Sequence, residues 1–166
     1  MKKLKISWEE YNQTIEKLAK IIRDSNYPFN MIVALARGGL RPGDVLSRIF
    51  KVPMAILSVE SYRGDNTEDQ RGHMVFSRDL ALTVAGIRDK VLLVDDLADS
   101  GITLEKSLQW LRHYYGFYIS EMKTATLWSK KDSKFKPDFC AKPLKDSPWI
   151  VQPFEIYENI RPKDLK

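Results

Sequence analysis

Several features that would narrow the class of a protein are scarce in this 166-residue sequence. A single cysteine, Cys140, excludes an internal disulfide and is typical of a reducing compartment. Only two histidines are present, and neither His73 nor His113 has a cysteine or a second histidine nearby with which to bind a metal. No apolar run approaches the roughly 18 residues that a transmembrane helix needs. We therefore expect a cytoplasmic protein without a membrane partner.

An excess of one charge is also missing, since the net charge is only +5 with 43% apolar and 30% charged residues. This modest positive charge suits anionic ligands such as nucleotides, but a nucleic-acid partner is not expected from it. The basic residues at the N-terminus are not followed by an apolar segment, so they do not indicate a secretory signal. Without repeats or low-complexity segments, the length predicts a single domain over residues 1–166.

The most informative stretch runs from Val91 to Leu104. Four apolar residues, Val91–Val94, predict a strand buried on both faces, and apolar residues from Leu104 onward recur at helical spacing. Between strand and helix lie carboxylates and then small residues: Asp95, Asp96, Asp99, Ser100, Gly101, Ile102 and Thr103. A helix N-terminus preceded by small residues binds phosphate. The carboxylates suit neighbouring hydroxyls, a metal, or a proton to be removed.

This stretch resembles the phosphoribosyl-pyrophosphate motif of type I phosphoribosyltransferases, which has an apolar strand, two acids, two small or apolar residues, an acid, and Ser/Thr-Gly-x-Thr. The resemblance implies that Asp95 and Asp96 meet the ribose hydroxyls, directly or through water bound to Mg²⁺. It implies that Asp99 takes or holds the proton at purine N7. The residues Ser100, Gly101, Ile102 and Thr103 would then cradle the 5′-phosphate.

A receiver domain of a response regulator also begins with Val-Asp-Asp after a strand. In that fold the acidic pair follows the first strand, and a later strand ends in a phospho-accepting aspartate. Here the pair lies past the middle of the chain, and the next predicted strand ends in Leu127-Trp128-Ser129-Lys130, which contains no acid. The receiver interpretation is therefore not favoured.

A second strand, turn and helix start is predicted around Arg37. Met31–Ala36 is a fully apolar strand, and Arg37-Gly38-Gly39-Leu40-Arg41 follows, with Pro42 in the first turn of a helix. Two arginines beside turn glycines at the end of a parallel strand favour anion binding. The segment resembles the pyrophosphate loop of the xanthine-guanine branch of the family. This implies that Arg37 and the Gly38 and Gly39 amides hold pyrophosphate, and that the Ala36–Arg37 peptide is cis.

After a third strand, Pro53–Val59, the residues from Ser61 to Gly72 include no aliphatic side chain. Long structureless loops in compact domains are usually functional, so this segment is expected to be an active-site lid. The resemblance assigns the Ser-Tyr pair of the family's mobile loop to Ser61 and Tyr62. A hairpin is expected over residues 73–84.

The base-binding residues are implied by two further matches. Leu127-Trp128-Ser129-Lys130, after the strand Met122–Trp128, is similar to the segment that carries the purine-binding lysine. The ammonium of Lys130 only donates, so it suits the O6 acceptor of a 6-oxopurine. The segment Trp149-Ile150-Val151-Gln152-Pro153-Phe154-Glu155 resembles Trp-Ile-x-x-Pro-aromatic-acid of xanthine-guanine enzymes. This implies that Trp149 stacks on the base and that the Ile150 carbonyl meets a group at C2.

The expected fold is α/β: the type I phosphoribosyltransferase fold, a mostly parallel twisted sheet flanked by helices, with a small hood. The core would span about residues 31–128, and the hood would form from the N-terminus and residues 130–166. A first helix is predicted from Ser7 to Asp24, because Ser7 and Glu10 form a capping box. Ligands would bind where the carboxyl ends of the strands meet.

The implied activity is transfer of ribose 5-phosphate from phosphoribosyl pyrophosphate to guanine, xanthine or hypoxanthine in purine salvage, with release of pyrophosphate. The partners would be phosphoribosyl pyrophosphate, a purine base, Mg²⁺ and further copies of the chain in a dimer or tetramer. Two alternatives remain: a phosphoribosyltransferase for another base, and a regulatory nucleotide-binding protein on the same fold. The intact Asp99 favours an enzyme, since a sensor needs no base.

Overall fold

A six-stranded sheet forms the centre of the computed structural model, which describes residues 3–61 and 74–165. Its strand order is β4-β3-β2-β5-β6-β7, and only the β3–β4 pair is antiparallel. The strands are β2 (Met31–Ala36), β3 (Met54–Ser61), β4 (Met74–Phe76), β5 (Asp89–Ala98), β6 (Ile119–Ser129) and β7 (Phe139–Pro143). The sheet is therefore mostly parallel, as the sequence predicts.

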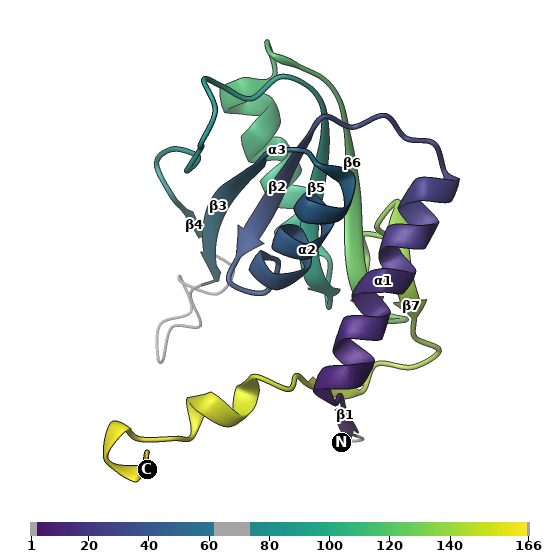
Figure 1. The fold of residues 1–166 in the computed structure, drawn as a ribbon, viewed down its shortest axis with the longest axis vertical. Helices are drawn as coiled ribbons and strands as arrows, with labels where there is room; N and C mark the ends of the chain where they lie inside the picture. Colours follow the sequence, from purple (N-terminus) through teal and green to yellow (C-terminus); the bar gives the residue numbers. More distant parts are fainter. Residues whose placement is uncertain (1–2, 62–73, 166) are drawn as a thin grey trace.

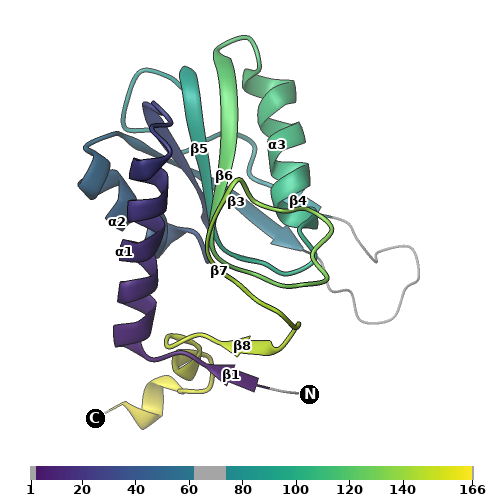
Figure 2. The ribbon, with the colours of Figure 1, turned by 90° about the vertical axis from the view of Figure 1, so that its right-hand side faces the viewer.

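Helices cover both faces of this sheet (Figure 1). Figure 2 shows α1 (Trp8–Asp24) and α2 (Leu40–Phe50) on one face and α3 (Ile102–Tyr115) on the other. Alternate residues of each central strand enter two separate apolar clusters: Ile32 and Leu92 pack with α1 and α2, whereas Val33 and Leu93 pack with α3. This arrangement confirms the α/β class and explains why the strands are apolar without alternation.

The first helix begins as its capping box predicts. The Ser7 hydroxyl accepts a hydrogen bond from the Glu10 amide at 3.1 Å, and the helix ends at Asp24. Its apolar stripe, Tyr11, Ile15, Leu18 and Ile22, is buried against the sheet. Among the described residues, no helix is long and apolar enough to cross a membrane.

The acidic pair lies in a strand and not in the turn that the sequence predicts. β5 continues to Ala98, with Asp95 opposite Thr126 and Leu97 opposite Trp128 of β6. Backbone pairing with β6 thus extends past the apolar run that ends at Val94. As a result, the turn before α3 is shortened and the carboxylates start from a fixed strand.

Over the described residues 74–84, the hairpin expected for residues 73–84 is not formed. Residues 74–76 pair instead with β3, antiparallel, and Ala81 forms an isolated bridge with Ile56. The pairing partner is therefore the preceding strand, which already offers an unpaired edge. The sequence pattern of 73–84 alone could not identify that edge.

A second, two-stranded sheet joins distant parts of the sequence. β1 (Lys3–Lys5) lies parallel to β8 (Trp149–Val151), with Leu4 opposite Ile150. The Ile6 amide extends the pairing by donating to the Val151 carbonyl at 3.0 Å. The 3₁₀ turns η2 (Glu155–Glu158) and η3 (Pro162–Asp164) follow. The core and hood boundaries remain a prediction, while α1 and β7 belong to the layers of the large sheet.

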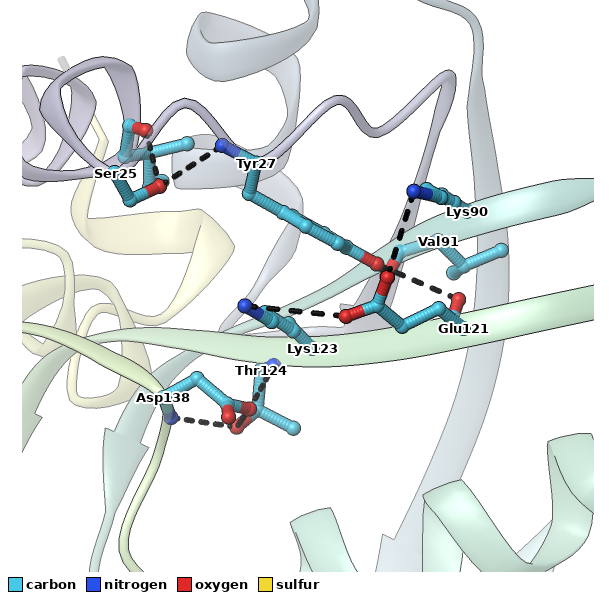
Figure 3. Close-up of polar contacts among 9 residues, drawn as sticks. Ser25, Tyr27, Lys90, Val91, Glu121, Lys123, Thr124 and Asp138 are labelled. Carbon is cyan, nitrogen blue, oxygen red and sulfur yellow. Dashed lines mark hydrogen bonds and ion pairs between the residues drawn. The ribbon is translucent and has the colours of Figure 1, made fainter.

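Polar contacts fix the end of the large sheet at which the parallel strands begin (Figure 3). The Tyr27 hydroxyl donates to the Val91 carbonyl at 3.2 Å, and the Lys123 ammonium lies 4.7 Å from the centre of the Tyr27 ring. The Asp138 carboxylate accepts from the Thr124 amide at 2.7 Å, which ties β7 to β6. Ligands of parallel sheets bind at the opposite end, beside the carboxyl ends of the strands.

Candidate active site

A pocket of about 860 Å³ opens beside the carboxyl ends of β2, β5 and β6. Its lining includes residues from every predicted group except the 5′-phosphate cradle and the lid: Arg37, Gly38, Asp96, Asp99, Lys130, Trp149 and Ile150. These residues come from β5, from β8 and from the loops that follow β2, β5 and β6. The structure therefore brings these seven predicted site residues together, whereas the predicted residues Gly39 and Asp95 do not line this pocket.

Lys130 and Asp99 form an ion pair inside this pocket. The Lys130 Nζ lies 2.9 Å from the Asp99 Oδ1, and the lysine side chain is 10% exposed against 59% for the aspartate. The Lys130 amide donates to the Ala98 carbonyl at 3.0 Å, which fixes the lysine backbone beside the end of β5. A hydrogen-bond donor and a carboxylate thus stand side by side, with the carboxylate facing solvent.

The Asp95 and Asp96 carboxylates lie close to one another in the interior. The Asp96 amide donates to the Asp95 Oδ1 at 2.9 Å. Burial raises the pKa of Asp95 well above its ordinary value, and the Asp96 carboxylate raises that pKa further. Burial also raises the pKa of Asp96. A cation or a set of hydroxyl donors bound at this pair would favour its charged form.

The Arg37 turn packs tightly against the end of β5. The Ala36–Arg37 peptide is cis, as the family resemblance implies. A Cβ on Gly38 would come within 2.8 Å of the Asp96 Oδ2, so only glycine leaves room for this carboxylate. Gly39 differs from Gly38 in that its amide donates a hydrogen bond to the Leu35 carbonyl, at 2.8 Å. Of the two glycines, only Gly38 lines the pocket.

The predicted phosphate cradle forms the start of α3. Gly101 is the N-cap of this helix with φ +81°, and within the described residues no side chain caps the helix. The Ser100 hydroxyl accepts from the Ile102 amide at 3.4 Å, a long hydrogen bond. Ser100 and Ile102 are exposed, and Thr103 is half-buried. The first turn of α3 therefore has the properties of an anion site next to the pocket.

Trp149 and Ile150 are presented by the β1–β8 sheet. The Trp149 side chain is exposed while Ile150 is buried in the apolar cluster of α1. Since successive side chains of a strand point to opposite sides, Ile150 anchors the strand and leaves Trp149 free at the pocket. This is the arrangement that a base-stacking residue needs.

Several lining residues were not predicted as site residues. Arg41 lies over two aromatic rings, 5.0 Å from the centre of Trp8 and 5.5 Å from that of Phe154. Gln152 and Glu155 lie within the quoted Trp-Ile-x-x-Pro-aromatic-acid segment, so the motif already contained the signal for them. Nothing in the sequence pointed to Tyr157 or Glu158, whose approach to the pocket follows from the η2 turn.

The lid prediction falls largely outside the part of the chain that the structure describes. Ser61 is the last residue of β3, and Tyr62 lies in the segment 62–73, outside the described residues. The lid therefore stays a prediction from the sequence.

Comparison with known proteins identifies the class. Residues 7–159 match the phosphoribosyl transferase domain, and the chain belongs to this family. A xanthine-guanine phosphoribosyltransferase of Idiomarina loihiensis is 29% identical over 153 residues, or 92% of this chain and 86% of that protein. One of Gluconobacter oxydans is 26% identical over 90% of this chain and 83% of its own length.

Solved structures of phosphoribosyltransferases have a similar fold. A purine phosphoribosyltransferase from Pyrococcus horikoshii is 29% identical and has a TM-score of 0.75, covering 93% of this chain and 95% of its own. The xanthine-guanine-hypoxanthine phosphoribosyltransferase of Helicobacter pylori has a TM-score of 0.75 at 22% identity, over 94% of this chain and 96% of its own. The second comparison establishes the shared fold.

Proposed function

We propose that this chain is a purine phosphoribosyltransferase that transfers ribose 5-phosphate from phosphoribosyl pyrophosphate to a ring nitrogen of a 6-oxopurine. The observation that carries the proposal is the Lys130–Asp99 pair, 2.9 Å apart in a pocket that Trp149 also lines. In a 6-oxopurine, O6 and N7 are neighbouring atoms on one edge of the base. A donor-only ammonium and a carboxylate in contact match an acceptor and an N–H in the same positions.

In this reaction the bond from C1′ to pyrophosphate breaks while positive charge develops on the ribose ring. Asp95 and Asp96 hold the ribose hydroxyls, and the turn from Ser100 to Thr103 holds the 5′-phosphate. Arg37, with the amide of Gly38, holds the departing pyrophosphate. The hydrogen bond from the Gly39 amide to the Leu35 carbonyl supports a role for Gly39 in shaping the turn.

Asp99 then accepts the proton that leaves N7, and its exposure on the pocket side supports this role. Lys130 donates to O6 and so keeps the base in register with C1′. Trp149 covers one face of the base and excludes water from it, and the Ile150 carbonyl faces the groups at C2.

Magnesium fits the acidic pair. Mg²⁺ takes six oxygen ligands and is usually held by one or two carboxylates together with substrate phosphates. Asp95 and Asp96 supply two neighbouring carboxylates whose raised pKa values a bound cation would lower. Within the described residues no group of three or more potential ligands occurs, so most ligands would come from phosphoribosyl pyrophosphate and water. When bound, the ion would neutralise charge on the leaving pyrophosphate.

Turnover with phosphoribosyl pyrophosphate and each of several bases tests the proposal. We expect use of guanine, xanthine or hypoxanthine and little use of adenine, orotate or uracil. Adenine carries an amino donor at C6 that would confront the Lys130 ammonium, and each unpaired buried polar group costs about 1–3 kcal/mol. Efficient turnover of adenine would rule out the 6-oxopurine assignment.

The first prediction is that Lys130→Met raises KM for the 6-oxopurine by about 10-fold or more and leaves KM for phosphoribosyl pyrophosphate nearly unchanged. The physical reason is the loss of a charge-assisted hydrogen bond to O6. Lys131→Met is the matched control, because Lys131 is the exposed neighbour and does not line the pocket. Equal base selectivity in both variants would contradict the role of Lys130.

A further inference from the structure

One pocket residue connects the base side of the site to the acidic pair. Gln152 follows β8, and its Nε2 donates to the Asp96 Oδ2 at 3.1 Å. The side chain lines the pocket but is only 5% exposed in total. Gln152 stands three residues after Trp149, so this hydrogen bond joins the segment that presents the base to the strand that presents the carboxylates.

The rest of the Gln152 amide is poorly suited to a structural role. Its Oε1 is buried and has no hydrogen-bond partner among the described residues. An unpaired buried acceptor destabilises a fold, and an apolar side chain of the same size would avoid this loss. A buried polar group that keeps only one of its bonds therefore needs an explanation outside stability.

The surroundings of Asp96 supply that explanation. On one side the carboxylate lies against Gly38, where a Cβ would come within 2.8 Å of its Oδ2. On the other side it accepts from Gln152. The position of Gln152 is itself fixed, since its backbone amide donates to the Glu155 Oε1 at 2.8 Å. The carboxylate is thus held between a turn without a side chain and an anchored amide.

We propose that Gln152 is a positioning residue for phosphoribosyl pyrophosphate: it orients the Asp96 carboxylate toward the ribose hydroxyls. This inference rests on the proposed function and extends it, because it assigns to the base-presenting segment a part in binding the other substrate. Gln152 is assigned no contact with the base or with the reacting atoms. It acts through Asp96, which accepts from a ligand hydroxyl in the proposed function.

The test is Gln152→Met, which keeps the length of the side chain and removes the amide. We expect the dissociation constant for phosphoribosyl pyrophosphate with Mg²⁺, measured by calorimetry without a base, to rise by about 10-fold. KM for the 6-oxopurine should change less than twofold, and Tm should stay equal to that of the wild type or rise. A lower Tm with unchanged affinity would make Gln152 a structural residue and overturn the proposal.

A double-mutant cycle with Asp96→Ala gives a second measurement. If Gln152 acts through Asp96, then Gln152→Met adds less than a twofold effect once the carboxylate is absent. If the two substitutions raise the dissociation constant for phosphoribosyl pyrophosphate independently, so that their factors multiply, the proposal is overturned. It is also overturned if Gln152→Met changes only KM for the base.

The binding experiment also separates this inference from the proposed function. Wild-type protein that binds phosphoribosyl pyrophosphate and uses no 6-oxopurine would contradict the assigned base and leave the role of Gln152 standing. Equal affinities in wild type and Gln152→Met, with normal turnover of a 6-oxopurine, would contradict only the role of Gln152.

Discussion

Gly101 begins α3 with a backbone conformation that other residues rarely adopt. Its φ is +81°, and a Cβ would lie 2.7 Å from the Phe135 amide nitrogen and 2.8 Å from the Ser133 Oγ. The motif alone explains this glycine by the close approach of phosphate. The structure adds that the loop after Lys130 packs on it, so its side-chain position is already occupied.

We therefore predict that Gly101→Ala lowers the free energy of unfolding by about 1–3 kcal/mol, in addition to weakening phosphoribosyl pyrophosphate binding. Denaturant unfolding measures the first effect. Gly86→Ala is the control, because a Cβ at Gly86 would meet nothing within 4 Å. Equal stability of the two variants would contradict this account.

Asp95 is a second residue at which function and stability oppose each other. Its pKa in the folded protein is raised by burial and by Asp96, so the charged form is disfavoured on folding. Stability from this group is fully present below the unfolded pKa and is lost as pH rises through the folded pKa. At neutral pH the pair destabilises the protein, as sites built for a charged ligand often do.

Asp95→Asn should therefore raise Tm at pH 7–8 by about 2–4 °C while activity falls. The difference from wild type should shrink as pH is lowered toward 4. Asn still offers an oxygen to the Asp96 amide, so the hydrogen bond can persist. Asp79→Asn, at an exposed position, should change Tm little at any pH. A lower Tm for Asp95→Asn at neutral pH would show that the carboxylate pair does not destabilise the folded protein.

Among the elements, β1 has the most direct effect on the site despite its length. Its three residues pair with the strand that carries Trp149 and Ile150, and this pairing is the only strand contact that β8 makes among the described residues. A change in β1 should therefore reach the base directly and the acidic pair in β5 only through Gln152.

We predict that Leu4→Pro raises KM for the base by about 10-fold and KM for phosphoribosyl pyrophosphate by a smaller factor, because Gln152 is also anchored by Glu155. A proline has no N–H to donate and is poorly tolerated inside a paired strand. Leu4→Ala keeps the backbone donor and serves as the control for the loss of the side chain. If both variants raise KM equally, the packing of Leu4 and not the pairing positions Trp149.

At the scale of the whole molecule, the centre of the large sheet could be predicted from the sequence because β2 and the middle of β5 are continuous apolar runs. Met31–Ala36 and Val91–Val94 are buried on both faces, and such runs have few alternative structures. β1 was not predicted, since Lys3–Lys5 contains one apolar residue and forms a strand only beside β8. Tertiary pairing, and not local pattern, decides such short strands.

The same distinction holds for the site. Arg37, Asp99 and Lys130 were predicted because each lies in a segment that resembles a family motif and follows a recognisable strand, where parallel sheets place ligand-binding loops. The contact of Gln152 with Asp96 joins positions 56 residues apart, and no local pattern specifies it. The burial that raises the pKa values of the acidic pair likewise follows from the assembled layers and not from the motif.

The separation of β1 and β8 from the six-stranded sheet also bears on how such a protein diversifies. In the proposed function the ribose phosphate and one edge of the base are bound by residues at the end of the large sheet, whereas one face of the base is covered by Trp149 of β8, a strand that shares no ladder with that sheet. Replacing residues 3–5 and 149–151 together would change what the site accepts over the face of the base and at C2, without shifting any strand register of the large sheet. Donor and acceptor specificity can then drift at different rates in one chain.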